Sequence, residues 1–303
     1  MSSKTTESGP LLLALPGAES LAAAIAAGCG GETAGVTTHR FPDGESLVRL
    51  ESSVAGRHVV LTAYLHEPDA KLLPLLFAAD TARELGATRV TLVAPYLPYM
   101  RQDMRFRPGE AVTSHTFAAV VSAHVDALLT IDPHLHRIAS LDAIYPIRAR
   151  ALRAAPAMAD WLRHEVPLPL LVGPDSESAQ WVEGVAALVG APWTVLDKQR
   201  FGDHDVAVAF REVPDWRGRT PVLLDDIVST GRTLAAAARA LIAAGAAAPL
   251  CVGVHALCNS DAEQALRAAG VTRLVTCDTV PHPTNAIPVA PLLAAALADL
   301  EAS

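Results

Sequence analysis

The sequence predicts an α/β protein with two related halves, each a central, mainly parallel β-sheet flanked by helices. Short apolar runs of strand length alternate with longer, alanine-rich helical segments, which is typical of parallel sheets covered on both faces. This pattern repeats once along the chain. The length of 303 residues also suits two domains of ordinary size. We therefore expect two tandem α/β domains.

The predicted strands are short, largely apolar runs, at residues 58–64, 90–96, 127–132, 168–175, 220–226, 250–257 and 273–278. The predicted helices are longer and richer in alanine, at residues 71–85, 178–189 and 231–245. Gly86 and Gly245 each stand where a helix needs a glycine C-cap.

An internal repeat relates residues 58–96 to residues 220–257, since both contain a strand, a loop, a helix and a strand. The loops differ: the first reads "LHEPDAK" and the second "DDIVSTGRT". We interpret the second copy as chemically equipped and the first as degenerate. A break at Pro146, followed by a new helical run, predicts domains at 1–147 and 148–303, with the C-terminal tail free to pack on the first domain.

Composition and charge narrow the function classes. Apolar residues make up 51% of the chain, and the net charge of −8 argues against a nucleic-acid binder. An acidic enzyme of anionic substrates needs a locally basic site or a metal ion. Apolar runs are too short to span a membrane, and the N-terminal run is interrupted at Pro16, which argues against a signal peptide. The four cysteines show no CxxC spacing, and we expect a reducing, cytoplasmic location.

The most informative stretch is "VLLDDIVSTGRT" (222–233), in which Asp225 and Asp226 end a predicted strand. Ligands of open parallel sheets bind beyond the carboxyl ends of the strands. The following small polar residues and Gly231 lead into a helix, whose N-terminus can hold a phosphate. The carboxylates would repel a phosphate, but they can accept hydrogen bonds from sugar hydroxyls. The stretch therefore predicts a sugar-phosphate site; the structural alternative is that the aspartates only cap the helix.

This stretch resembles the phosphoribosyl pyrophosphate (PRPP) loop of type I phosphoribosyltransferases and of ribose-phosphate diphosphokinases. Further stretches resemble the diphosphokinases, in family order: "FPDGE" (41–45), "RQD" (101–103), "TIDPHLH" (130–136), "VGPDSES" (172–178), "LDKQR" (196–200) and "CDTVP" (277–281). The resemblance implies two tandem type I phosphoribosyltransferase-like domains. It implies transfer of the diphosphoryl group of ATP to the 1-hydroxyl of ribose 5-phosphate, giving PRPP and AMP.

The resemblance also implies roles for individual residues. ATP would be bound by Phe41, Asp43, Glu45, Arg101 and Gln102. In the family, the segment that corresponds to residues 41–45 serves the site of a neighbouring subunit, so a homo-oligomer is implied.

The remaining roles are also implied by the resemblance. Mg²⁺ is the implied cofactor, with His134 and Asp175 as metal-linked ligands. Lys198 and Arg200 would stabilise the transition state from a mobile loop. Ribose 5-phosphate and PRPP would be bound by Asp225, Asp226, Ser229, Thr230, Gly231, Arg232 and Thr233.

Some residues depart from the family pattern. Ser229 stands where most members have an acid, and Arg232 where a second small residue is usual. Pro133 follows Asp132 and predicts an extended backbone there. Two alternatives therefore stay open: a phosphoribosyltransferase that consumes PRPP, and a catalytically silent regulatory subunit.

Overall fold

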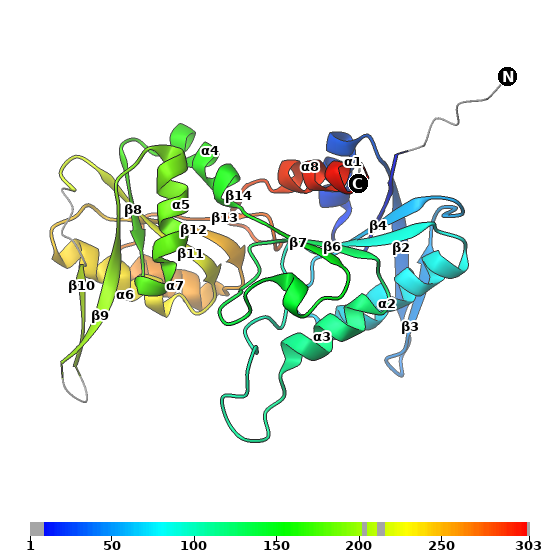
Figure 1. The fold of residues 1–303 in the computed structure, drawn as a ribbon. Coiled ribbons are helices and arrows are strands. Elements are labelled where there is room, and N and C mark those ends of the chain that lie inside the picture. Colours follow the sequence, from blue (N-terminus) through cyan, green and yellow to red (C-terminus); the bar gives the residue numbers. More distant parts are fainter. Residues whose placement is uncertain (1–8, 202–204, 211–215, 302–303) are drawn as a thin grey trace. The chain divides into compact units, whose positions relative to one another are not determined.

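The computed structural model describes residues 9–201, 205–210 and 216–301 (Figure 1). The chain divides into two compact units, the first formed by Met1–Leu152 with Val289–Ser303 and the second by Arg153–Pro288. Each unit contains one seven-stranded sheet. The predicted class, two α/β domains with mainly parallel sheets, is confirmed.

The first sheet has the strand order β3-β2-β1-β4-β5-β6-β7 and is parallel except for the β2–β3 hairpin. Its strands are β1 (Leu11–Ala14), β2 (Glu32–Arg40), β3 (Ser46–Leu50), β4 (His58–Thr62), β5 (Arg89–Val93), β6 (Ala127–Ile131) and β7 (Arg148–Leu152).

The second sheet has the order β10-β9-β8-β11-β12-β13-β14 and is parallel except for the β9–β10 hairpin. Its strands are β8 (Pro169–Gly173), β9 (Trp193–Phe201), β10 (Asp205–Phe210), β11 (Thr220–Val228), β12 (Leu250–Ala256), β13 (Leu274–Cys277) and β14 (Asn285–Ile287).

The two orders are identical when seven is added to each strand number. The predicted internal repeat is therefore confirmed, and it extends over the whole of both sheets. All predicted strands and helices are present, with ends that differ by at most three residues. Gly86 and Gly245 adopt positive φ after their helices, as a C-cap requires.

Helices cover both sheets. The α-helices are α1 (Glu19–Cys29), α2 (Asp69–Glu84), α3 (Thr113–Ser122), α4 (Ala155–Glu165), α5 (Ala179–Val189), α6 (Arg232–Ala243), α7 (Ser260–Ala268) and α8 (Ala290–Glu301). Two short 3₁₀ helices are η1 (Leu141–Ala143) and η2 (Ser176–Ser178).

In each half of the chain, the helix that follows the last strand packs in the other unit. α4 follows the last strand of the first sheet but packs on α5 in the second unit, whereas α8 follows the last strand of the second sheet and packs on α1 in the first unit. Hydrogen bonds from Arg89 to the carbonyl of Leu300 and from Arg150 to that of Ala296 also hold α8 in the first unit.

The central strands are buried on both faces, which explains their uninterrupted apolar sequences. Each unit has its own apolar core, one including Leu61, Leu92 and Leu128 and the other Leu170, Leu223 and Leu241. Each sheet therefore offers a rigid row of strand ends on which a site can be built.

Two local predictions were wrong. The helical run expected after Pro146 begins only at Ala155, because Arg148–Leu152 pairs with β6 and completes the first sheet. The boundary after residue 147 thus precedes this strand, whereas the two units part after Leu152. Residues 197–201 were expected in an irregular loop but belong to β9, because they pair with β10 in an antiparallel hairpin.

The docking of α8 can be tested at Gly28 in α1. A Cβ added there would lie 2.7 Å from the Cβ of Ala294 in α8, closer than two carbon atoms can approach. We expect Gly28→Ala to lower the free energy of unfolding by about 1–3 kcal/mol, although alanine favours helices. Chemical denaturation followed by circular dichroism measures the change.

The matched control is Gly184→Ala, in the middle of α5, where an added Cβ meets nothing within 4 Å. This substitution should stabilise the chain by about 0.5–1 kcal/mol because it removes backbone freedom from the unfolded state. Equal effects of the two substitutions would show that α8 does not pack on α1 in solution.

Candidate functional site

The acidic pair lies at the carboxyl edge of the second sheet. The prediction that Asp225 and Asp226 end their strand was wrong by two residues, because β11 continues to Val228. The continuation occurs because Ile227 and Val228 still pair with β12. Both aspartates are half-buried, in contrast to the fully buried run 221–224 that precedes them.

A short turn, Ser229–Gly231, connects β11 to α6. Gly231 has a φ of +68° and lies so close to α7 that an added Cβ would be 3.2 Å from the carbonyl oxygen of Ala262. No side chain caps α6, so its first-turn N–H groups are available to an anion. Thr233 lies half-buried in the first turn, whereas the side chain of Arg232 is exposed. The turn thus combines close backbone packing, unpaired helix N–H groups and an exposed arginine.

A third carboxylate approaches the pair from the neighbouring strand. Asp175 follows β8, which is hydrogen-bonded to β11. Its side chain accepts a hydrogen bond from the backbone N–H of Ser178 (3.3 Å). Burial, the charge and hydrogen bond of Asp226, and the charge of Asp175 together raise the pKa of Asp225 well above its usual value. Three carboxyl groups are therefore close together at this edge.

A buried polar pair, missed in the sequence, lies at the same edge. His255 pairs in register with Ile227, and its Nδ1 is 2.9 Å from the hydroxyl oxygen of Thr279. That hydroxyl donates to the carbonyl of Val254 (2.7 Å), so it accepts from an N–H of His255. A histidine at the end of the apolar run 250–257 was the signal that could have identified this residue.

In the first unit, "FPDGE" forms the tight turn between β2 and β3. The N–H of Phe41 donates to the carbonyl of Glu45 (2.8 Å), and the side chain of Asp43 accepts from the N–H of Glu45 (3.0 Å). One oxygen of Asp43 is thus used within the turn. Phe41 is 41% exposed and contacts the ring of His39 edge-on. The turn presents an aromatic ring to solvent at one end of the sheet.

Arg101 and Gln102 lie in the long connection between β5 and α3. Tyr99 precedes them with a φ of +64°, and its hydroxyl hydrogen-bonds Asp69. Burial and Asp69 raise the pKa of Tyr99 to about 12, so it stays a donor at neutral pH. The carbonyl of Gln102 accepts from the backbone and hydroxyl of Ser114 (3.4 and 3.2 Å). The backbone of this segment is therefore anchored, while the side chain of Arg101 is exposed.

His134 follows β6 and is half-buried, with its ring stacked on that of His136 at 5.7 Å. The predicted extended backbone at Asp132 was wrong, since its φ is +33°. Pro133 disfavours the right-handed helical region, and aspartate tolerates positive φ better than most residues. The N–H of Asp132 donates to the carbonyl of Leu152 (2.8 Å), which holds this conformation.

The backbones of Lys198 and Arg200 lie in β9, paired with Val208 and Val206 of β10. Their side chains are outside the described part of the structure.

The predicted site residues whose side chains the structure describes fall into three sets. Asp175 lies with the 225–233 segment, whereas Arg101, Gln102 and His134 follow neighbouring strands of the other sheet. The Phe41–Glu45 turn follows β2, three strand spacings or about 14 Å along the edge from β5. Among the described residues, no three His, Cys, Asp or Glu side chains form a group that could hold a metal ion.

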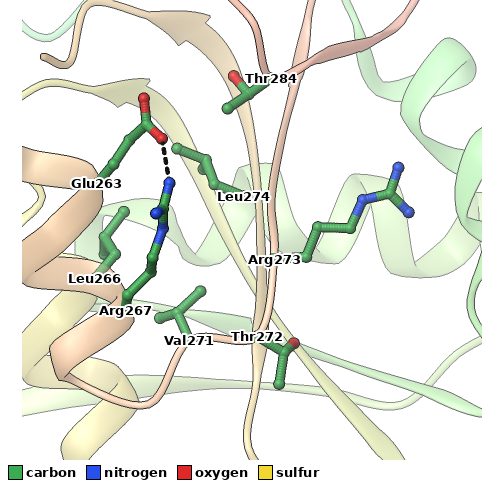
Figure 2. A pocket seen from close by; sticks show the side chains of 8 residues that line it. All are labelled: Glu263, Leu266, Arg267, Val271, Thr272, Arg273, Leu274 and Thr284. Carbon is green, nitrogen blue, oxygen red and sulfur yellow. Dashed lines mark hydrogen bonds and ion pairs between the residues drawn. The ribbon is translucent and has the colours of Figure 1, made fainter. Parts of the chain in front are cut away.

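A cavity of about 240 Å³ lies beside α7 in the second unit. Figure 2 shows Arg267 paired with Glu263, one turn away on the same helix α7, while the side chain of Arg273 points away from that pair. The guanidinium of Arg273 lies 5.4 Å from the centre of the Trp161 ring. None of the predicted site residues lines this cavity.

Comparisons with known proteins agree across the chain. A model of the N-terminal domain of ribose phosphate pyrophosphokinase matches residues 11–124, and a phosphoribosyl transferase domain model matches residues 140–292. The chain is 37% identical over 271 residues to a ribose-phosphate pyrophosphokinase of Methanopyrus kandleri, with 89% of this chain and 92% of the relative covered. It is 33% identical to that of Halobacterium salinarum, with 95% and 100% covered.

A solved structure is similar over nearly the whole chain. It is the crystal structure of phosphoribosylpyrophosphate synthetase from Mycobacterium smegmatis, with a TM-score of 0.82 and 25% identity, covering 97% of this chain and 100% of the other. Pyrophosphokinase and diphosphokinase name the same activity.

The charge repulsion at Asp225 predicts a stabilising substitution. A carboxyl group whose pKa is raised in the folded state lowers stability as the pH rises above its unfolded pKa. Asp225→Asn removes this penalty, and its amide can donate to Asp226. We expect a higher unfolding temperature at pH 7–8 and no difference once the pH is below the ordinary aspartate pKa, as measured by calorimetry.

The control is Asp160→Asn on the exposed face of α4, which should change the unfolding temperature little at any pH. A gain at Asp225 that is the same at low and neutral pH would contradict the electrostatic explanation.

Proposed function

The chain belongs to the ribose-phosphate pyrophosphokinase family, and from this premise we propose that it transfers the diphosphoryl group of ATP to ribose 5-phosphate. The oxygen of the 1-hydroxyl group forms a bond to the β-phosphorus of ATP. The bond between the β-phosphorus and the oxygen that bridges to the α-phosphate breaks, and AMP leaves with that oxygen. The hydroxyl proton is lost, and PRPP is the other product. The observation that carries this proposal is the acidic pair beside the uncapped N-terminus of α6.

Ribose 5-phosphate fits the second unit. The first-turn N–H groups of α6 and the hydroxyls of Ser229, Thr230 and Thr233 would hold its phosphate. Asp225 and Asp226 would accept hydrogen bonds from the ring hydroxyls. This role suits carboxylates, which repel a phosphate but accept hydrogen bonds from the sugar that carries it. Arg232 would add positive charge from the exposed side of the turn.

The donors of this edge suit Mg²⁺, because carboxylate oxygens are its preferred protein ligands and the repulsion that raises the pKa of Asp225 leaves negative charge to be neutralised. We propose Asp175 and His134 as metal-linked ligands. When bound, the ion would neutralise charge on the phosphate oxygens. Mg²⁺ is commonly held by one or two side chains together with substrate phosphates, which is compatible with the lack of a three-residue group among the described residues.

ATP binding is assigned to residues of the first unit. Arg101 can contact phosphate oxygens in a bidentate manner, and Gln102 can hydrogen-bond the nucleotide. The exposed ring of Phe41 would stack on adenine, with Asp43 and Glu45 bonding polar groups nearby. Lys198 and Arg200 would stabilise the negative charge of the transferring group.

We also propose a homo-oligomer in which the Phe41–Glu45 turn serves a neighbouring copy. The turn lies far along the sheet edge from Arg101, which supports donation to another subunit. Nearby, α2 exposes Leu73 (56%) and Phe77 (43%) one turn apart, and β3 exposes Leu47 (43%). Such an apolar surface suits a contact between copies.

A cytoplasmic location is proposed from the four cysteines, none of which is in a disulfide, as suits a reducing compartment. Within the described residues, no helix has the length and apolar character needed to cross a bilayer.

The deciding experiment incubates purified protein with ATP, Mg²⁺ and ribose 5-phosphate and measures AMP and PRPP. Formation of both, in equal amounts and only with all three present, supports the proposal. Product that forms only from PRPP and a nucleobase would identify a phosphoribosyltransferase instead. No turnover in either assay, with activity restored to a catalytic relative on mixing, would indicate a regulatory subunit.

The role of Lys198 predicts a selective loss of turnover. Lys198→Ala should lower kcat by about 100-fold or more because a cation near the transferring group is removed. The dissociation constant for ATP, measured by calorimetry, should change by less than about threefold. The control is Gln199→Ala, at the neighbouring uncharged residue. An equal loss of kcat there would show that the loss comes from disturbing the strand and not from removing the cation.

The proposed subunit contact predicts an effect of charge on α2. Phe77→Glu should reduce the molar mass measured by light scattering and also reduce activity, because the neighbour's Phe41 is withdrawn. Leu188→Glu, at an equally exposed site on α5 (44%), should leave the mass unchanged. A Phe77→Glu protein of unchanged mass would place the contact elsewhere.

A further inference from the structure

An ion pair connects two irregular segments of the first unit. Asp103 lies in the connection between β5 and α3, and Arg137 lies in the connection that follows β6. Nη1 of Arg137 is 3.2 Å from Oδ1 of Asp103 and 3.4 Å from Oδ2. The two residues are 34 positions apart in the sequence, so the pair holds together segments that the backbone alone does not join.

The environment of the pair is asymmetric. The side chain of Asp103 is only 2% exposed, whereas that of Arg137 is 47% exposed. A buried carboxylate without a partner is costly, so Asp103 holds the guanidinium strongly. Arg137 also lies 5.5 Å from the centre of the Phe106 ring, a cation–π contact within the Asp103 segment. Two different interactions therefore fix Arg137 to the same segment.

The ion pair lies next to two segments with proposed ligand-binding residues. Asp103 directly follows Gln102, and Arg137 is three residues after His134. On the other side, Tyr99 is tied to Asp69 of α2. The Arg101–Gln102 segment is thus held at both ends, and the end held by Arg137 is the one connected to the histidine.

We propose that Arg137 is a positioning residue that sets the Arg101–Gln102 segment relative to His134 through its contacts with Asp103 and Phe106. This inference rests on the proposed function, in which the first segment binds ATP and the histidine is linked to the metal ion. Arg137 contacts neither substrate. Its guanidinium couples the two segments, so that the nucleotide and the metal-linked ligand are presented together.

Three variants separate positioning from simple charge neutralisation. Arg137→Met keeps the length of the side chain and removes its charge and hydrogen bonds. Arg137→Lys keeps the charge but replaces the planar guanidinium that contacts both Asp103 and the Phe106 ring. Asp103→Asn combined with Arg137→Met removes both charges, so no carboxylate is left buried and unpaired.

The readouts are the dissociation constant of ATP with Mg²⁺ by calorimetry, the KM for each substrate and the unfolding temperature. We expect Arg137→Met to weaken ATP binding and raise the KM for ATP by about tenfold, as for other residues that orient ligands from outside the site. The KM for ribose 5-phosphate should stay within about twofold. Arg137→Lys should recover part of the loss, and the double variant should fold stably but remain defective.

The matched control is Arg83→Met, which removes another half-exposed arginine paired with an aspartate, Asp126, at 3.1 Å. Arg83 belongs to the last turn of α2, at the opposite edge of the same sheet, and should leave ATP binding unchanged. The proposal is overturned if Arg137→Met behaves like this control, if both KM values rise equally, or if the double variant regains wild-type ATP binding.

The outcome is independent of the test of function. ATP binding is measured without turnover, so a protein that forms no PRPP but loses ATP affinity on Arg137→Met would fail the proposed function and keep the positioning role. A protein that forms PRPP, and whose Arg137→Met variant keeps full ATP affinity, would support the proposed function and contradict the positioning role.

Discussion

The second unit depends on an electrostatic compromise at one edge of its sheet. Parallel pairing of β8 and β11 places Asp175, Asp225 and Asp226 together at the carboxyl ends of their strands. Burial, together with the charges of Asp226 and Asp175, raises the pKa of Asp225, so its ionisation opposes folding at neutral pH. The apolar core beneath and the ladder that continues through Ile227 and Val228 hold them in place nevertheless. A site that keeps like charges together before its ligands bind is organised for cations and hydroxyl groups.

The turn beside these carboxylates needs the opposite property, and backbone geometry supplies it. An uncapped helix N-terminus offers positive potential without a basic side chain, so an acidic chain can hold a phosphate next to aspartates. Close packing of Gly231 against α7 fixes the direction of these N–H groups. The carboxylates and these N–H groups are thus neighbours along the chain, because the former lie near the end of a strand and the latter at the start of the helix that follows it.

Predictions from the sequence succeeded where burial is local and failed where pairing is distant. β4, β5 and β6 are covered on both faces, so their apolar runs were recognisable. β2 is mostly exposed and residues 197–201 of β9 were expected as a loop, since each of these strands forms an antiparallel hairpin with the edge strand, and such backbone pairing leaves little sequence pattern. The residues of the 225–233 segment were predictable because they are contiguous. Arg137 and His255 were missed because their partners lie 34 and 24 residues away.

The first unit shows what the repeat became without the acidic site. Its connection from β4 to α2 corresponds to the turn before α6, yet Pro68 stands at the helix N-cap and no glycine allows close approach of an anion. Asp69 occupies the first turn and binds the hydroxyl of Tyr99, while Lys71 donates to the carbonyl of His66 (2.6 Å). Burial lowers the pKa of Lys71. The connection that we propose as a ligand site in the second unit therefore serves, in the first, to anchor the segment that carries Arg101 and Gln102.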